Sequence, residues 1–132
     1  MELIELSTER RSEMVEITGE VARVLRRSGV TEGVAVIQSL HTTAGITINE
    51  NADPDVKHDM TEKLDRLFPR DEAFFRHAEG NSDSHLKTSY VGPSVTVIVA
   101  GGELVLGTWQ GIYFCEWDGP RSRRVGVKVL GT

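Results

Sequence analysis

The sequence has little cysteine, no long apolar run and no excess of basic residues. Its single cysteine among 132 residues, Cys115, excludes an intrachain disulfide and an all-cysteine metal site. Because Cys115 lies in an apolar, strand-like run, we expect a buried and unreactive thiol. No apolar run approaches the length that crosses a bilayer, and the first residues lack the pattern of a secretory signal. We therefore expect a cytoplasmic protein with no membrane partner.

Positive charge is also scarce. Fifteen Lys and Arg residues stand against twenty Asp and Glu residues, which gives a formal net charge of −5. This balance argues against a nucleic-acid partner, since the only basic cluster, residues 121–124, is too short to form a binding groove. The glycine-rich phosphate loops, the dinucleotide fingerprint and the G-x-S-x-G elbow are all absent. We therefore expect no nucleotide cofactor.

The length and the residue patterns predict one domain that spans residues 1–132. A hydrophobic fraction of 39% and a charged fraction of 27% are ordinary for a globular protein. Short alternating or apolar runs predict seven or eight strands, and helical spacing predicts two or three short helices. The fold class is therefore α+β and β-rich, with two packed sheets in a β-sandwich-like domain. The expected strands are residues 2–7, 14–17, 33–40, 46–49, 95–99, 104–106, 110–117 and 125–129, and the expected helices are residues 18–28, 54–68 and a short one through 85–87.

Residues 41–56 are the most informative stretch. Ile46 and Ile48 alternate with polar residues, which indicates a half-buried strand, and Asp53-Pro54 is typical of a helix N-cap followed by the first helical position. A helix N-terminus favours an anion. By contrast, the unbroken apolar run 34–37 predicts a strand buried on both faces.

Three histidines and three acidic residues are candidates for chemistry. His41, His77 and His85 lie at strand ends or in polar loops, where imidazoles bind divalent ions such as Zn²⁺. Taken singly, each is more often a hydrogen-bonding or surface residue. Glu50, Asp53 and Asp55 could hold Mg²⁺ against a phosphate, or one of them could act as a general base. Asp53 could also have the purely structural role of a helix N-cap.

The segment 116–123 joins acids, a tight turn and two arginines. Arg121 and Arg123 could clamp a phosphate, or they could form a salt-bridged turn with Asp118 or meet a neighbouring subunit. Trp109 and Gln110 offer an aromatic face and an amide to a flat ring, although a core position is more usual for tryptophan.

Five motifs in order along the chain together resemble the YjbQ-like family, which is known for a secondary thiamine-phosphate synthase activity. Two small departures are Ser84, where the family usually has alanine, and Trp117, where phenylalanine is common. The motifs are His41-Thr42-Thr43-Ala44 with Asn49-Glu50-Asn51, Asp53-Pro54-Asp55-Val56, Asn81-x-x-Ser84-His85-Leu86-Lys87, Gly107-Thr108-Trp109-Gln110 and Asp118-Gly119-Pro120-Arg121-x-Arg123.

The resemblance implies a homotrimer and a weak activity that couples hydroxymethylpyrimidine pyrophosphate to a thiazole phosphate, compatible with another principal role. We expect the polar candidates to meet in one pocket. The alternatives are a non-catalytic trimeric binder of a small anionic metabolite and a metal-dependent hydrolase of a phosphorylated small molecule. The expected roles are catalysis by Asp53, His85 and Glu50, substrate binding by Asn49, Lys87, Trp109, Gln110, Arg121 and Arg123, and binding of Zn²⁺ or Mg²⁺ by His41, His77 and His85.

Overall fold

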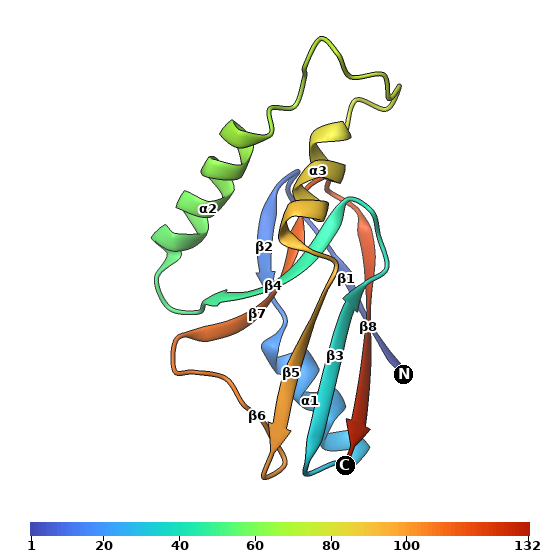
Figure 1. Ribbon diagram of the computed structural model, residues 1–132, viewed down its shortest axis with the longest axis vertical. Helices are drawn as coiled ribbons and strands as arrows, with labels where there is room; N and C mark the ends of the chain where they lie inside the picture. Colours follow the sequence, from blue (N-terminus) through green and yellow to red (C-terminus); the bar gives the residue numbers. More distant parts are fainter.

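The computed structural model describes all 132 residues, which form eight strands and three helices (Figure 1). None of the helices is both long enough and apolar enough to cross a membrane. In chain order the elements are β1 (Glu2–Ser7), β2 (Glu13–Glu16), α1 (Thr18–Ser28), β3 (Gly33–Ser39), β4 (Ala44–Glu50), α2 (Pro54–Leu67), α3 (Ser82–Val91), β5 (Ser94–Ala100), β6 (Glu103–Leu104), β7 (Gln110–Glu116) and β8 (Ser122–Gly131).

The strands form two antiparallel sheets, which confirms the predicted fold class. The larger sheet has the order β1-β8-β3-β5-β6, and the smaller has the order β2-β7-β4. Helix α1 buries Val21, Val24 and Leu25 in the main core, against the inward side chains of both sheets. The period-two alternation of the strands supplies those side chains, because every second residue faces the same side of a sheet.

Strand β3 departs from the expectation of burial on both faces. Ala35 and Ile37 are fully buried, whereas Val34 and Val36 are only half-buried. The run is apolar throughout, but no second layer covers the outer face of the larger sheet. A continuous apolar run is therefore not enough to predict a central, doubly covered strand.

Helices α2 and α3 lie near the smaller sheet (Figure 1). The backbone N–H of Asp55 donates to Asp53 Oδ1 over 2.9 Å, so Asp53 caps α2 as the sequence predicts. Only Leu64 of α2 is fully buried, in a second apolar cluster that includes Cys115 and Trp117. Burial raises the pKa of the Cys115 thiol to about 12, in line with the expected unreactive cysteine.

The turn between β7 and β8 packs tightly onto the loop between β1 and β2. A Cβ atom at Gly119 would lie 2.1 Å from the backbone oxygen of Arg10 and 2.8 Å from Thr8 Oγ1. Only glycine allows this approach. The turn thereby holds Asp118 and Arg121 beside the start of α3, where Ser84 Oγ donates to the backbone oxygen of Trp117 over 2.5 Å.

Candidate functional site

A polar hollow of about 280 Å³ opens where α3 begins, beside the β7–β8 turn. No hydrophobic residue lines it. Its walls come from the segment after β3, the segment before α3, the first turns of α3 and the start of β8. The nine lining residues are Thr42, Thr43, His77, Glu79, Asn81, His85, Asp118, Arg121 and Arg123.

Two histidines face each other in this hollow. The ring centroids of His77 and His85 are 5.5 Å apart, and the rings meet edge to face. His85 lies in the first turns of α3, and His77 lies in the segment that precedes the helix. The structure thus brings together two of the three predicted metal ligands.

The third, His41, does not line the hollow. Its Nε2 accepts a hydrogen bond from the backbone N–H of Arg124 over 2.9 Å, so the proton of the neutral ring is on Nδ1. Desolvation and the positive charge of Arg123 lower the pKa of His41. No group of three or more His, Cys, Asp or Glu side chains in the chain is placed to hold a metal ion. The predicted three-histidine site is therefore not assembled within one chain, because the β8 backbone engages His41.

Arg121 presents a positive charge to the hollow from a fixed position. Its Nη2 lies 2.9 Å from Asp118 Oδ2, and its Nε donates to the backbone oxygen of Asp118 over 2.8 Å. Asn81 Nδ2 also donates to Asp118 Oδ2, over 2.7 Å. Burial alone would raise the pKa of Asp118, but these hydrogen bonds and the charge of Arg121 hold it below its ordinary value. The alternative of a salt-bridged turn is thus confirmed for Arg121, whose side chain stays half-exposed.

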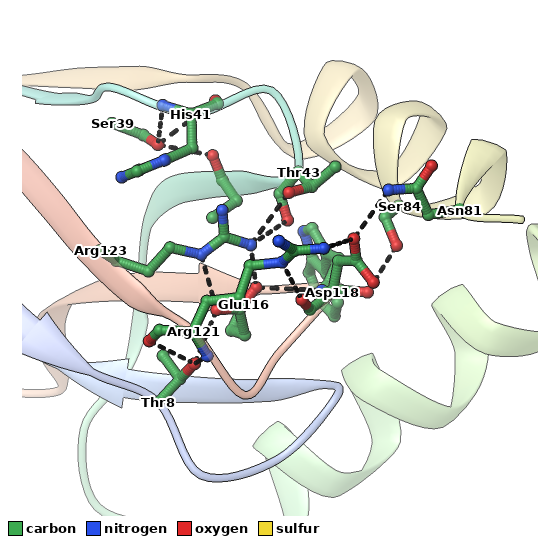
Figure 2. Close-up of polar contacts among 12 residues, drawn as sticks. Thr8, Ser39, His41, Thr43, Asn81, Ser84, Glu116, Asp118, Arg121 and Arg123 are labelled. Carbon is green, nitrogen blue, oxygen red and sulfur yellow. Dashed lines mark hydrogen bonds and ion pairs between the residues drawn. The ribbon is translucent and has the colours of Figure 1, made fainter. Parts of the chain in front are cut away.

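Arg123 lines the same hollow, although it is almost fully buried. Its Nε and Nη2 donate to the Glu116 carboxylate, and Nη2 also donates to Thr43 Oγ1 over 2.9 Å (Figure 2). Its other terminal nitrogen, Nη1, makes no hydrogen bond within the chain. Thr8 Oγ1 completes the cluster by donating to Glu116 Oε1 over 2.7 Å. One nitrogen of a rigidly held guanidinium therefore remains for a ligand.

Lys87 is not placed to bind substrate. Its side chain is 1% exposed, and its Nζ lies 2.6 Å from Asp65 Oδ1 and 3.3 Å from Asp83 Oδ2. Arg11 makes a two-pronged hydrogen bond to the same Asp83 carboxylate. Burial would raise the pKa of Asp83, but the bonds and charges of Arg11 and Lys87 outweigh it and lower the pKa. The predicted substrate-binding role of Lys87 is replaced by a structural one, because its buried ammonium group pairs with Asp65 and Asp83 and does not line the hollow.

The remaining predicted residues lie at the other end of the smaller sheet. Strand β4 runs from Ala44, near the hollow, to Glu50, and seven extended residues span roughly 20 Å. Trp109 is 64% exposed, so it is not a core residue. The expected single pocket does not form within one chain, because the extended strand β4 separates the residues of the hollow from a distant group at the other end of the smaller sheet. The distant group is Asn49, Glu50, Asp53, Trp109 and Gln110.

Four of the five members of the distant group, all but Trp109, have a local side-chain hydrogen bond. Glu50 Oε2 accepts from the backbone N–H of Ala52 over 3.1 Å, and Gln110 Oε1 accepts from the backbone N–H of Gly107 over 2.7 Å. Asn49 Oδ1 accepts from the backbone N–H of Glu50. These contacts shape the turns that follow β4 and precede β7.

The sequence analysis did not identify Glu79, which lines the hollow. Nothing in the exposed segment before α3 marks this residue as part of a site.

Comparison with known proteins gives one family along the whole chain. The family model described as UPF0047 protein YjbQ-like matches residues 2–132. The UPF0047 protein YugU of Bacillus subtilis is 53% identical over 131 residues, 99% of each chain. The UPF0047 protein MJ1081 of Methanocaldococcus jannaschii is 52% identical over 127 residues, 96% of this chain and 91% of that protein.

Solved structures agree with these relatives. A crystal structure of an uncharacterised protein of the YjbQ/UPF0047 family from Clostridium acetobutylicum has a TM-score of 0.96 and 48% identity, and the match covers 98% of this chain and 100% of that one. A conserved hypothetical protein from Thermus thermophilus, TT1486, has a TM-score of 0.91 and 39% identity, with 98% and 100% covered. None of these names states an activity.

Proposed function

We propose that this chain, which belongs to the UPF0047 family of YjbQ-like proteins, binds a phosphorylated small molecule in the hollow and catalyses thiamine-phosphate formation there. One observation carries the proposal: Arg121, Arg123 and the His77–His85 pair converge on a hollow without hydrophobic residues. The hollow also lies at the N-terminus of α3, where Asn81 makes no capping bond and turns its amide to Asp118 instead. Uncapped N–H groups and cations together favour an anion.

The reaction needs charges of both signs and no proton transfer in its bond-making step. The thiazole nitrogen attacks the methylene carbon of the pyrimidine, the bond from carbon to the pyrophosphate oxygen breaks, and the electron pair leaves with the pyrophosphate. Positive groups stabilise that leaving group, and a carboxylate stabilises the charge that develops on the organic fragment. Arg121 and Arg123 fit the first task, with the His85 ring as a hydrogen-bonding group beside them, and Asp118 and Glu79 fit the second. In this proposal Asp118 and Glu79 take the catalytic role that the sequence analysis gave to Glu50 and Asp53.

The size of the hollow limits what one chain can hold. About 280 Å³ is at the lower edge of ordinary small-molecule sites, which suits one phosphorylated ring but not two. We expect a homotrimer in which a neighbouring copy contributes the surface for the second ring. Trp109 and Gln110, exposed at the far end of the smaller sheet, offer an aromatic face and an amide for that purpose.

A divalent ion, Zn²⁺ or Mg²⁺, would find two nitrogen ligands in the hollow, His77 and His85. Phosphate oxygens are suitable further ligands for either ion. We therefore expect the ion to bind together with the phosphorylated ligand. Metal analysis of protein prepared with and without the ligand checks this, and a full equivalent of metal in an unliganded His85→Ala variant would contradict it.

Turnover of the two substrates tests the proposed reaction. Pyrophosphate release is measured for the wild type, Arg121→Gln, His85→Ala and Asp53→Asn. We expect a loss of about 100-fold or more in kcat/KM for the first two variants, the scale of removing one group that stabilises developing charge. Asp53→Asn should stay within about twofold of the wild type, since a helix cap takes no part in the chemistry. Equal activity in all four proteins would refute the assignment.

A non-catalytic binder of an anionic metabolite is the second candidate. It is favoured by the position of Glu50 and Asp53 away from the hollow, which leaves Glu79 and Asp118 as its only acids. Phosphate binding without turnover, weakened in Arg121→Gln, would support this candidate over the synthase. Release of phosphate from a single substrate would instead indicate a hydrolase.

A further inference from the structure

The segment between α2 and α3, residues 69–80, projects from the molecule. In Figure 1 it extends beyond the ends of both helices at the top of the view. It begins at Pro69 and ends at Gly80, whose φ of 69° is a conformation that favours glycine. His77 and Glu79 of this segment line the hollow. The same segment therefore forms one wall of the site and continues beyond it.

Few contacts hold this segment in place. Both of its backbone hydrogen bonds join residues within the segment. Its one hydrogen bond to a residue outside it joins Glu79 to the adjacent Asn81, over 3.5 Å. None of its charged side chains makes an ion pair. A segment with so few contacts to the rest of the chain moves more easily than the two helices that it joins.

The middle of this segment carries an exposed aromatic residue, Phe74. Its side chain is 74% exposed. Its ring packs edge to face on Phe75, with the centroids 5.0 Å apart, and neither ring belongs to an apolar cluster of the core. Burial of a phenyl ring is favourable, so Phe74 offers apolar area to whatever binds beside it.

The hollow itself lacks such a surface. It offers Arg121 and Arg123 to a phosphate, but no apolar side chain to a ring that carries the phosphate. Phe74 precedes the wall residue His77 by three positions, so the chain between their Cα atoms spans at most about 11 Å. Rotation of the segment about its two ends brings Phe74 over the mouth of the hollow.

We propose that Phe74 closes over the hollow when a ligand binds and stacks on an aromatic ring that carries the bound phosphate. This assignment rests on the phosphate binding proposed above, and it adds the class of ligand: an aromatic phosphate, in preference to an aliphatic phosphate of the same charge. The two rings bury each other's faces, and the projecting segment supplies the apolar surface that the hollow lacks.

Calorimetry with phenyl phosphate, methyl phosphate and inorganic phosphate tests this assignment. The wild type should bind phenyl phosphate about fivefold more tightly than methyl phosphate, the scale of one aromatic pair. Phe74→Ala should abolish this preference and leave the affinity for inorganic phosphate unchanged. Phe74→Leu should keep part of the preference, since it retains apolar area without a ring.

Tyr90→Ala is the matched control. Tyr90 is an aromatic residue that is 67% exposed, and it lies in the last turn of α3, whereas the hollow opens at the start of that helix. This variant should keep the full preference for phenyl phosphate. Circular dichroism should show the wild-type fold for every variant, because the altered side chains are exposed.

A fluorescent variant reports the closure directly. In Phe74→Trp, the emission of the new indole should move to shorter wavelength when phenyl phosphate excludes water from it. Inorganic phosphate should leave the emission almost unchanged. The wild type, whose tryptophans are Trp109 and Trp117, gives the background signal. An emission that phenyl phosphate does not move would overturn the closure.

The outcomes separate this assignment from the proposed function. A wild type that binds no inorganic phosphate overturns both. Phosphate binding with equal affinities for phenyl and methyl phosphate overturns only the role of Phe74. A preference that survives Phe74→Ala, or that Tyr90→Ala abolishes equally, also overturns that role and leaves phosphate binding in the hollow intact.

Discussion

Arg123 and Glu116 form a buried ion pair that closes the base of the β7–β8 turn. Their side chains are 3% and 0% exposed, and the pair joins the last residue of β7 to the second residue of β8. Burial would raise the pKa of Glu116, but the hydrogen bonds from Arg123, Asp118 and Thr8 lower it. The carboxylate therefore stays ionised and holds the guanidinium at the wall of the hollow.

The first prediction concerns this pair. Glu116→Gln should lower the free energy of unfolding by about 3–5 kcal/mol, because it leaves the Arg123 charge buried without its partner. The double variant Glu116→Leu with Arg123→Leu should lose less than the sum of the single changes. Urea unfolding measures each value. Arg66→Ala, which breaks an exposed pair on α2, is the control and should cost less than about 1 kcal/mol.

The second prediction concerns the pH dependence of stability. The pKa of His41 lies below its ordinary value of 6.5 in the folded chain, so the folded state binds fewer protons than the unfolded state between these two values. Stability should therefore fall as the pH drops through 6.5. His41→Gln should flatten this slope between about pH 7 and pH 5.5, as measured by unfolding at each pH.

His58 gives the control of opposite sign. The hydrogen bond to Asp59 raises the pKa of His58 above its ordinary value of 6.5. The contribution of His58 to folding stability is therefore complete below pH 6.5 and is lost as the pH rises through the raised pKa. His58→Gln should leave the acid-side decline in place. A decline that is equally steep in the wild type and in His41→Gln would contradict the second prediction.

Most of the fold was predictable from the sequence because it depends on local patterns. The helix expected at residues 54–68 is α2 (Pro54–Leu67), and the strand expected at 33–40 is β3 (Gly33–Ser39). The Asp53-Pro54 pair fixed the first of these boundaries through capping chemistry. Strand β8 (Ser122–Gly131) is longer than the predicted 125–129, because pairing with both β1 and β3 extends it beyond its alternating valines.

The site was less predictable because its parts meet only through the tertiary structure. The local motif around Arg121 indicated an anion site, and the salt-bridged turn was one of the alternatives. No local pattern could show that seven extended residues of β4 carry Asn49 and Glu50 away from the hollow. Nor could helical spacing show that Lys87, which is charged and therefore expected on the surface, points into an ion-pair network with Asp83.

The third prediction follows from that network. Lys87→Met should lower the free energy of unfolding by about 3 kcal/mol, since the buried carboxylate of Asp83 then loses one of its two cationic partners. Phosphate affinity, measured by calorimetry on the folded variant, should stay within about twofold of the wild type, because no new charge faces the ligand. A Lys87→Met variant that is as stable as the wild type but binds phosphate much more weakly would instead support the predicted role of Lys87 in substrate binding.

The last prediction separates the two aspartates that follow strands of the smaller sheet. Asp53 caps α2 at the distant end, whereas Asp118 lines the hollow and fixes both Arg121 and Asn81. Asp53→Ala should lower the free energy of unfolding by about 1 kcal/mol and leave phosphate affinity unchanged. Asp118→Asn keeps the size of the side chain and removes its negative charge, and the backbone oxygen of residue 118 still accepts the hydrogen bond from Arg121 Nε.

Calorimetry and turnover distinguish the two aspartates. Removing the negative charge of Asp118 reduces repulsion of an anion, which alone would strengthen phosphate binding. In a synthase, the same change also removes the group that stabilises the charge developing on the organic fragment. Asp118→Asn should therefore bind inorganic phosphate at least as tightly as the wild type and turn over substrate about 100-fold more slowly. Weaker phosphate binding with unchanged turnover would show that Asp118 only positions Arg121 and that the chemistry lies elsewhere.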